Sequence, residues 1–194
     1  KHGFSAQYPM VELATGLTFA LVFTNIFPHF TQMTLVWQDW VQFFLWLTMT
    51  AFLIIVFIYD LKYYLILDVV VIPAAILAFI FNMLLGVNPL SMLLAAVVGG
   101  GFFLIQYVVS KGKWIGGGDI RLGFLMGIIL GWPQILTALF IAYVLGSLIS
   151  VGLLLFSKKH MSDKVPFGTF LAIATFLTML YGQQLVHWYM NLFN

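Results

Sequence analysis

Residues 41–60 read VQFFLWLTMTAFLIIVFIYD, an almost unbroken apolar run that ends in an acid. As a helix, Val41–Tyr59 would be about 28 Å long at 1.5 Å per residue, close to the thickness of the hydrocarbon core of a bilayer. Asp60 would then lie at a membrane edge, where a carboxylate is costly unless it is paired, solvated or functional. The run therefore predicts a transmembrane helix that carries a candidate functional acid.

The rest of the chain has the same character. Of its 194 residues, 63% are hydrophobic and 7% are charged, and the mean hydropathy is +1.08. A soluble domain is about half apolar and a quarter charged. We therefore expect an all-α, polytopic transmembrane bundle forming one membrane-embedded domain over residues 1–194. The net charge of +2 does not indicate a nucleic-acid partner, and the lack of cysteine and the scattered histidines do not indicate a metal site.

Turn signals divide the chain into seven candidate spans. They cover residues 10–27, 41–59, 69–85, 90–109, 119–131, 134–156 and 168–187. The fifth is short, because residues 120–131 would make a helix of only about 18 Å. Asp119 would therefore lie below the membrane surface, unless the bilayer is thinner there. Non-helical backbone at that depth must line protein or water, so we expect a wet cavity beside the glycine loop that precedes Asp119.

Alternation of these spans gives the predicted bundle a charged face. All eight basic residues fall on that face: Lys1, Lys62, Lys111, Lys113, Arg121, Lys158, Lys159 and Lys164. The positive-inside rule predicts that it is cytoplasmic. Tryptophans fall near the opposite face, as an aromatic belt would: Trp37, Trp40, Trp132 and Trp188. Asp60, Asp68 and Asp119 are all predicted on the cytoplasmic side.

The two acids Asp60 and Asp119 form a candidate catalytic pair, since only two spans separate them along the chain. Peptide hydrolysis by two carboxyl groups needs one ionised member, which takes a proton from water, and one protonated member, which polarises the carbonyl. Gly116–Gly118, just before Asp119, permit positive φ and close approach by another backbone. The combination predicts acid–base hydrolysis of an extended peptide at a membrane face.

Each acid also has a simpler structural explanation. Asp60 could merely end its helix and meet Lys62, and Asp119 could be the N-cap of its short helix. Asp68 is first interpreted as an N-cap and second as a substrate contact. Glu12 is first interpreted as an acid near a helix N-terminus, with a weaker case for substrate binding. The glycines predict close helix packing at Gly99–Gly101, Gly123, Gly127 and Gly131.

Four segments form an ordered set of motifs. They read YPMVELATG at Tyr8–Gly16, DLKYYLILD at Asp60–Asp68, GGGDIRL at Gly116–Leu122 and, as the weakest of the four, VPFGTFLA at Val165–Ala172. The set resembles the YPxVELxTG, DxxxxxI/LPD, GxGDxKL and IPFGPxLA segments of bacterial type IV prepilin peptidases. This family consists of polytopic GxGD-type aspartyl proteases.

The resemblance implies that Asp60 and Asp119 are the catalytic pair. The candidate substrate-binding residues come from the sequence patterns above: Gly116, Gly117, Gly118, Asp68 and Glu12. It implies cleavage of the basic leader of prepilins or pseudopilins after a glycine, at the cytoplasmic face of the bacterial inner membrane. No cofactor is expected for proteolysis, and prepilins and membrane lipid are the expected partners. Many members also methylate the new N-terminus with S-adenosylmethionine.

The chain departs from the family pattern in three ways. Leu67 replaces the proline before the second acid of its motif, and Arg121 replaces a lysine, which keeps the charge but changes its hydrogen-bonding shape. Members usually carry a further first span and a cytoplasmic loop with paired CxxC motifs before YPxVEL. The sequence contains neither, so we expect the methyltransferase region and its metal site to lie outside this chain.

Three other functions remain as alternatives. Presenilin-type and signal-peptide-peptidase-type GxGD proteases place their acids on successive helices and follow them with a PAL motif, whereas here two spans intervene and Val165–Gly168 takes the later position. An ion-coupled carrier would place its acids near the bilayer midplane rather than at one face. A non-catalytic partner in pilus assembly would need neither acid.

Overall fold

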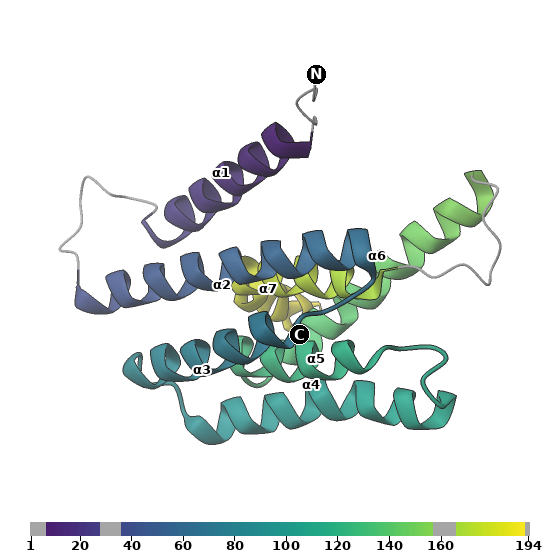
Figure 1. The fold of residues 1–194 in the computed structure, drawn as a ribbon. Helices are drawn as coiled ribbons and strands as arrows, with labels where there is room; N and C mark the ends of the chain where they lie inside the picture. The colour runs from purple at the N-terminus through teal and green to yellow at the C-terminus, as the bar shows by residue number, and fades with distance from the viewer. Residues whose placement is uncertain (1–6, 28–35, 157–165, 193–194) are drawn as a thin grey trace.

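A computed structural model describes residues 7–27, 36–156 and 166–192, and seven α-helices account for most of them. Their bounds are α1 Gln7–Ile26, α2 Trp37–Tyr63, α3 Asp68–Leu84, α4 Pro89–Ser110, α5 Gly117–Leu130, α6 Gln134–Phe156 and α7 Phe167–Asn191. Figure 1 shows them as one layered bundle, with α1 on one side and α4 on the other. The all-α prediction is confirmed.

Five of these helices are long and apolar enough to cross a membrane: α1, α2, α4, α6 and α7. The protein is therefore a multi-pass membrane protein with five candidate spans among the described residues. The helix α3 is also apolar but has only 17 residues. With 14 residues, α5 reaches about 21 Å, so the predicted shortness of this segment is confirmed.

The short helix α5 lies at the centre of the bundle, because glycines let its backbone touch that of α4. A Cβ added at Gly127 would lie 2.3 Å from the carbonyl carbon of Ala95, and one at Gly123 would lie 2.6 Å from the carbonyl oxygen of Gly99. Small residues allow this backbone contact between membrane helices. The packing prediction is therefore confirmed for Gly99, Gly123 and Gly127.

Two other glycines differ from the packing prediction. Gly131 ends α5 as its C-cap with a φ of 70°, a left-handed value that favours glycine. A Cβ added at Gly101 would meet nothing within 4 Å. Gly131 lies at the end of the α4–α5 contact, where an added Cβ would be 3.3 Å from Oγ of Ser91 on α4, whereas Gly101 takes no part in that contact.

A buried amide joins α3 to the far end of α5. The Nδ2 of Asn82 donates a hydrogen bond to the carbonyl oxygen of Ile128 over 2.8 Å. The last carbonyls of a helix have no partner within the helix, so this bond satisfies one that would otherwise be buried alone. At the other end of these helices, Asp68 at the start of α3 contacts Arg121 at the start of α5. The two contacts together hold α3 parallel to α5.

Four helix ends therefore meet at one end of the bundle: the C-terminus of α2 and the N-termini of α3, α5 and α7. Lys62 and Arg121 lie at this end of the bundle. Two tryptophans lie at the opposite end: Trp37 at the start of α2 and Trp132 just after α5. This matches the predicted separation of charge and tryptophan. The basic residues Lys1, Lys158, Lys159 and Lys164 lie outside the described residues.

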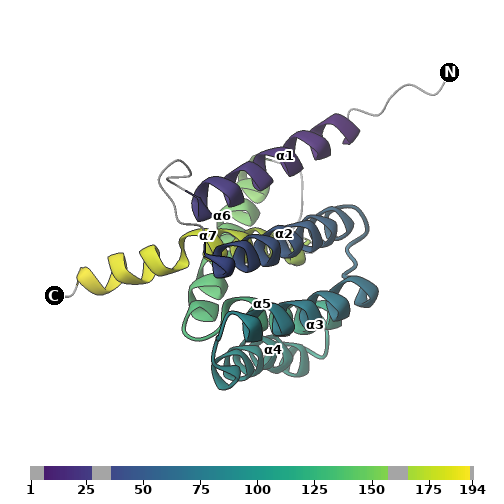
Figure 2. The same cartoon turned by 90° about the vertical axis from the view of Figure 1, so that its left-hand side faces the viewer.

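The helix α1 is the outermost element. Figure 2, turned by 90°, again places α2 between α1 and the group formed by α3, α4 and α5. Almost none of the apolar stretch of α1 is buried, and its main packing partner is α2. The helix that carries YPMVELATG is thus attached to the bundle through a single neighbour.

Candidate active site

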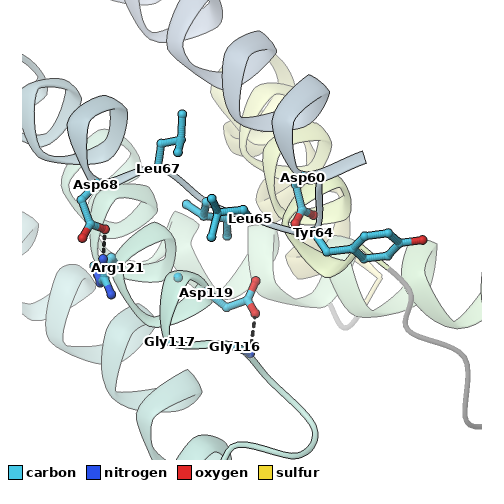
Figure 3. Close-up of a pocket in the computed structure, with 11 residues that line it drawn as sticks. Asp60, Tyr64, Leu65, Leu67, Asp68, Gly116, Gly117, Asp119 and Arg121 are labelled. Carbon is cyan, nitrogen blue, oxygen red and sulfur yellow. Dashed lines mark hydrogen bonds and ion pairs between the residues drawn. The ribbon is translucent and has the colours of Figure 1, made fainter. Parts of the chain in front are cut away.

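The converging helix ends enclose a cavity of about 510 Å³. Its lining comes from α2, the segment that joins α2 to α3, the first residue of α3, and α5 with the glycine before it, as Figure 3 shows. The lining residues are Asp60, Tyr64, Leu65, Ile66, Leu67, Asp68, Gly116, Gly117, Gly118, Asp119 and Arg121. Every candidate site residue named from the sequence therefore lines this cavity, with the exception of Glu12.

Asp60 is held by the first turn of α7. Its side chain is buried, and its Oδ2 accepts a hydrogen bond of 2.8 Å from the backbone N–H of Thr169. A Cβ at Gly168 would lie 2.8 Å from the same oxygen, so only glycine lets α7 approach this closely. The amino end of a helix presents free N–H groups and a partial positive charge, which favour a carboxylate. The position of Asp60 is thus fixed by α7.

Asp119 is the third residue of α5 and is also buried. Its Oδ2 accepts a hydrogen bond of 3.0 Å from the backbone N–H of Gly116, as the dashed line in Figure 3 indicates. The interpretation of Asp119 as the N-cap is wrong, because Gly116 occupies that position. The acid instead reaches back to its own N-cap residue, which fixes its carboxyl group on the cavity wall.

The two acids come from different helices and face the same cavity. Figure 3 shows both side chains turned into the space between α2 and α5. Their charges are close enough to repel each other. Two neighbouring carboxyl groups do not ionise together easily, so such a pair tends to share one proton. This arrangement can supply a base and an acid at one place, which is what hydrolysis of an amide requires.

The segment Tyr64–Leu67 lies beside both acids. Tyr64 has a φ of 55°, and its N–H donates to the carbonyl oxygen of Asp60, which ends α2 and turns the chain. Ile66 is buried, and a Cβ at Gly118 would lie 2.8 Å from the Cβ of Ile66. One glycine of the loop before Asp119 is therefore needed to make room for Ile66.

Asp68 and Arg121 form an ion pair at the rim of the cavity, between α3 and α5. About half of each side chain is exposed. The interpretation of Asp68 as an N-cap is wrong, because Leu67 occupies the N-cap position of α3. The φ of Leu67, −84°, is close to the value that proline fixes, so the loss of the family proline leaves the start of α3 in a similar conformation.

Glu12 lies away from the cavity on α1. The helix begins at Gln7 and has no acid in its first turn, so the interpretation of Glu12 as an acid at the helix N-terminus is wrong. Its side chain is exposed. In residues 7–27, 36–156 and 166–192, no group of three or more His, Cys, Asp or Glu side chains lies close enough to hold a metal ion.

Sequence reasoning missed the residues that position the acids. Gly168 and Thr169 hold Asp60, and Arg121 pairs with Asp68. The only available signal was the motif VPFGTFLA, which contains Gly168 and Thr169 but does not reveal which acid they touch.

Comparison with known proteins places the chain among leader peptidases. Residues 46–151 match the Type IV leader peptidase family. The chain is 29% identical over 195 residues to the prepilin leader peptidase/N-methyltransferase of Aeromonas salmonicida, covering 96% of this chain and 62% of that protein. It is 26% identical over 203 residues to the protein of the same name from Bacillus subtilis, covering 98% of this chain and 73% of that protein. No solved structure matches the chain.

The chain thus spans less than two thirds of the length of the Aeromonas relative. A similar relation holds for the Pseudomonas aeruginosa protein of the same name, which is 29% identical over 197 residues and of which the chain covers 64%. Both matches extend over nearly all of this chain, and therefore include α1 as well as the cavity.

Proposed function

Because the chain belongs to the type IV leader peptidase family, we propose that it is an aspartyl endopeptidase whose catalytic pair is Asp60 and Asp119. The observation that carries this proposal is the burial of these two acids, from separate helices, in one cavity. An acid used only to end or cap a helix would not need to face a second acid across such a space. Two carboxyl groups can hydrolyse a peptide bond without a metal ion, and this chemistry gives both side chains a role.

In the proposed reaction, the ionised member of the pair takes a proton from a water molecule, and the water oxygen attacks the peptide carbonyl. The protonated member donates to the carbonyl oxygen, which gives a tetrahedral intermediate. The C–N bond then breaks as the acid that took the water proton passes it to the leaving nitrogen, and a hydroxyl of the intermediate returns its proton to the other carboxylate. Thr169 and Gly116 keep the two carboxyl groups in place through their N–H groups. Gly116 and Gly117 offer accessible backbone along which an extended peptide can lie.

We propose prepilins or pseudopilins as substrates, cleaved beyond a basic leader. The relatives are named prepilin leader peptidases, and the chain resembles them along nearly its whole length. The proposed location is the bacterial inner membrane, in contact with lipid and with the cavity open to the cytoplasm. The basic residues Lys62, Lys111, Lys113 and Arg121 belong to the end of the bundle that holds the acids, which supports this orientation.

The seven helices are proposed to be seven spans of one domain. α3 runs from the cavity end, where Asp68 lies, to the opposite end, where Asn82 contacts α5. α4 then returns to the cavity end at Ser110, so α3 must cross although it is short. α5, shorter still, begins beside the cavity, which supplies water at the depth of Asp119.

The relatives are also named N-methyltransferases, and the resemblance implies S-adenosylmethionine as the methyl donor of full-length members. The described cavities do not fit this molecule. The polar cavity is lined by the two acids proposed for proteolysis, and in the second, apolar cavity the hydroxyls of Thr18 and Thr50 already donate to the carbonyl oxygens of Ala14 and Trp46. We assign no methyl transfer step to these residues.

The function is tested with the chain purified and reconstituted in lipid vesicles, with a prepilin in the same membrane. We expect removal of the leader without added cofactor, observed as a loss of mass and a new N-terminus. Folded protein that leaves the prepilin intact would contradict the proposal. Cleavage that stops on addition of a metal chelator would instead point to a different chemistry.

A smaller effect is expected at the ion pair on the rim. Changing Arg121 to Gln should lower the cleavage rate by roughly 1.4- to fivefold, because an exposed ion pair contributes about 0.2–1 kcal/mol. Arg121→Lys should stay within about twofold of the wild type, since it keeps the charge. Cleavage rates over a range of salt concentrations check this, and a rate for Arg121→Gln equal to that of the wild type contradicts it.

A further inference from the structure

The helices α1 and α2 form a wedge that is closed at only one end. At the closed end, the rings of Phe23 on α1 and Phe27, just after α1, pack against Phe43 and Trp40 on α2, with ring centroids 5.5–6.1 Å apart. From there toward its N-terminus, α1 moves away from α2, as Figure 1 shows. The open end of the wedge is the end of α2 that carries Asp60.

The wedge encloses a second cavity of about 700 Å³, which we name the α1 cleft. Its walls come from α1, α2 and α7, and most of its lining is aliphatic or aromatic. The lining residues are Met10, Val11, Ala14, Thr18, Thr50, Leu53, Ile54, Phe57, Ile58, Leu61, Lys62, Ala172, Ile173 and Phe176. The cleft thus offers an apolar surface inside the membrane rather than a site for a polar ligand.

The α1 cleft is lined by residues of α2 and α7 that lie close to the proposed catalytic acid Asp60. Leu61 and Lys62 follow Asp60 directly on α2, and Ala172 lies one turn beyond the residues of α7 that contact Asp60. Along α2, the lining runs from Lys62 back to Thr50, a rise of about 18 Å. An occupant that fills the cleft would therefore have one end within a turn of Asp60 and would extend about three turns into the membrane.

We propose that the α1 cleft binds the apolar helix of the substrate, with the leader end at the open mouth beside Asp60. This inference rests on the proposed function, in which the substrate carries a basic leader followed by an apolar helix. The exposed acid Glu12 follows the lining residue Val11 along α1 but is not itself part of the cleft lining. Lys62 is the charged residue of the lining and lies at the mouth, so the apolar helix, and not the leader, is placed inside the cleft.

Helix association within lipid depends on close packing, because lipid chains are as apolar as the side chains. Ala14 and Ala172 are small residues on facing walls of the cleft, which lets another helix approach closely.

Filling the cleft tests the inference. We expect Ala14→Trp to raise the KM for a full-length prepilin by about tenfold, because overpacking of this size displaces a helix. A short peptide that spans the cleavage site but lacks the apolar helix should be cleaved with unchanged kinetics. The matched control is Leu13→Trp, at a neighbouring position that is 67% exposed and does not line the cleft.

The outcomes separate this inference from the proposed function. Cleavage of neither substrate by the wild-type chain would reject the peptidase itself. Normal cleavage of both substrates by the Ala14→Trp variant would overturn the cleft as the binding site while leaving the peptidase intact. An equal loss with Leu13→Trp would also overturn it, because the effect would then come from α1 as a whole.

A second measurement identifies the occupant directly. A photoreactive phenylalanine at Phe57, in an inactive Asp119→Asn background, should cross-link to the apolar helix of bound prepilin. The same probe at Val97, which is 65% exposed on the outer face of α4, should label lipid instead. Labelling of lipid alone from position 57, in the presence of saturating prepilin, would show that an acyl chain fills the cleft and would overturn the inference.

Discussion

Replacing Asp60 or Asp119 with asparagine is expected to lower the kcat of leader cleavage by about 10²- to 10⁴-fold, the usual contribution of general acid–base catalysis. Asparagine keeps the shape of the side chain but can neither remove a proton from water nor share one with the other acid. Its amide oxygen can still accept the N–H of Thr169 at position 60 or that of Gly116 at position 119. The loss should therefore affect the reaction and not the fold.

The measurement is kcat in reconstituted vesicles, normalised to folded protein by size-exclusion chromatography and circular dichroism. Asp39→Asn is a matched control. It makes the same chemical change as Asp60→Asn on the same helix, but Asp39 lies at the opposite end of α2. It should cleave at the wild-type rate. Full activity in either Asp60→Asn or Asp119→Asn would reject the catalytic pair, whereas loss of folded protein would be detected separately by chromatography.

The meeting of the two acids could be predicted from the sequence because membrane topology is a strong constraint. Each apolar segment must cross the bilayer, so successive helix ends alternate between the two faces. Two spans between Asp60 and Asp119 therefore return the chain to the same face. The structure agrees: both residues line one cavity. Glycine spacing likewise predicted close helix packing at Gly123 and Gly127, although not that α4 would be the partner helix.

Local details at the helix ends could not be predicted as well. The cap preferences of Asp are worth only about 1 kcal/mol, so other contacts decide where a helix begins. Asp68 pairs with Arg121 and leaves the N-cap position to Leu67. Asp119 lies inside the first turn, because α5 already begins in the glycine loop at Gly117.

The contacts between distant segments were beyond the reach of local patterns. The residues Asp60 and Thr169 are 109 positions apart, and no spacing rule connects an acid with a glycine motif that far along the chain. The α1 cleft was hidden for another reason. α1 shows no marked difference in hydrophobicity between its faces, so the sequence does not tell which of its faces turns toward α2.

Position 168 offers the sharpest test of how Asp60 is held. We expect Gly168→Ala to lower kcat by about 10²-fold with little change in stability. The added Cβ would lie 2.8 Å from Oδ2 of Asp60 and 2.9 Å from Cδ1 of Ile66, so the carboxyl group or the first turn of α7 must move. A displacement of about 1 Å at a catalytic group can cost 10²-fold in rate. Alanine is itself a good helix former, so α7 should remain intact.

The control for Gly168→Ala is Gly101→Ala in α4, where an added Cβ would meet nothing within 4 Å. It makes the same change in a helix and should leave kcat unaltered. Comparing the kcat values of the two variants distinguishes the effect of displacing Asp60 from the general effect of replacing a glycine in a helix. If Gly168→Ala cleaves prepilin at the wild-type rate, then the contact between α7 and Asp60 does not set the geometry of the reaction. In that case the burial of Asp60 against α7 would be a feature of packing, and the alignment of the pair would depend on α2 and α5 alone.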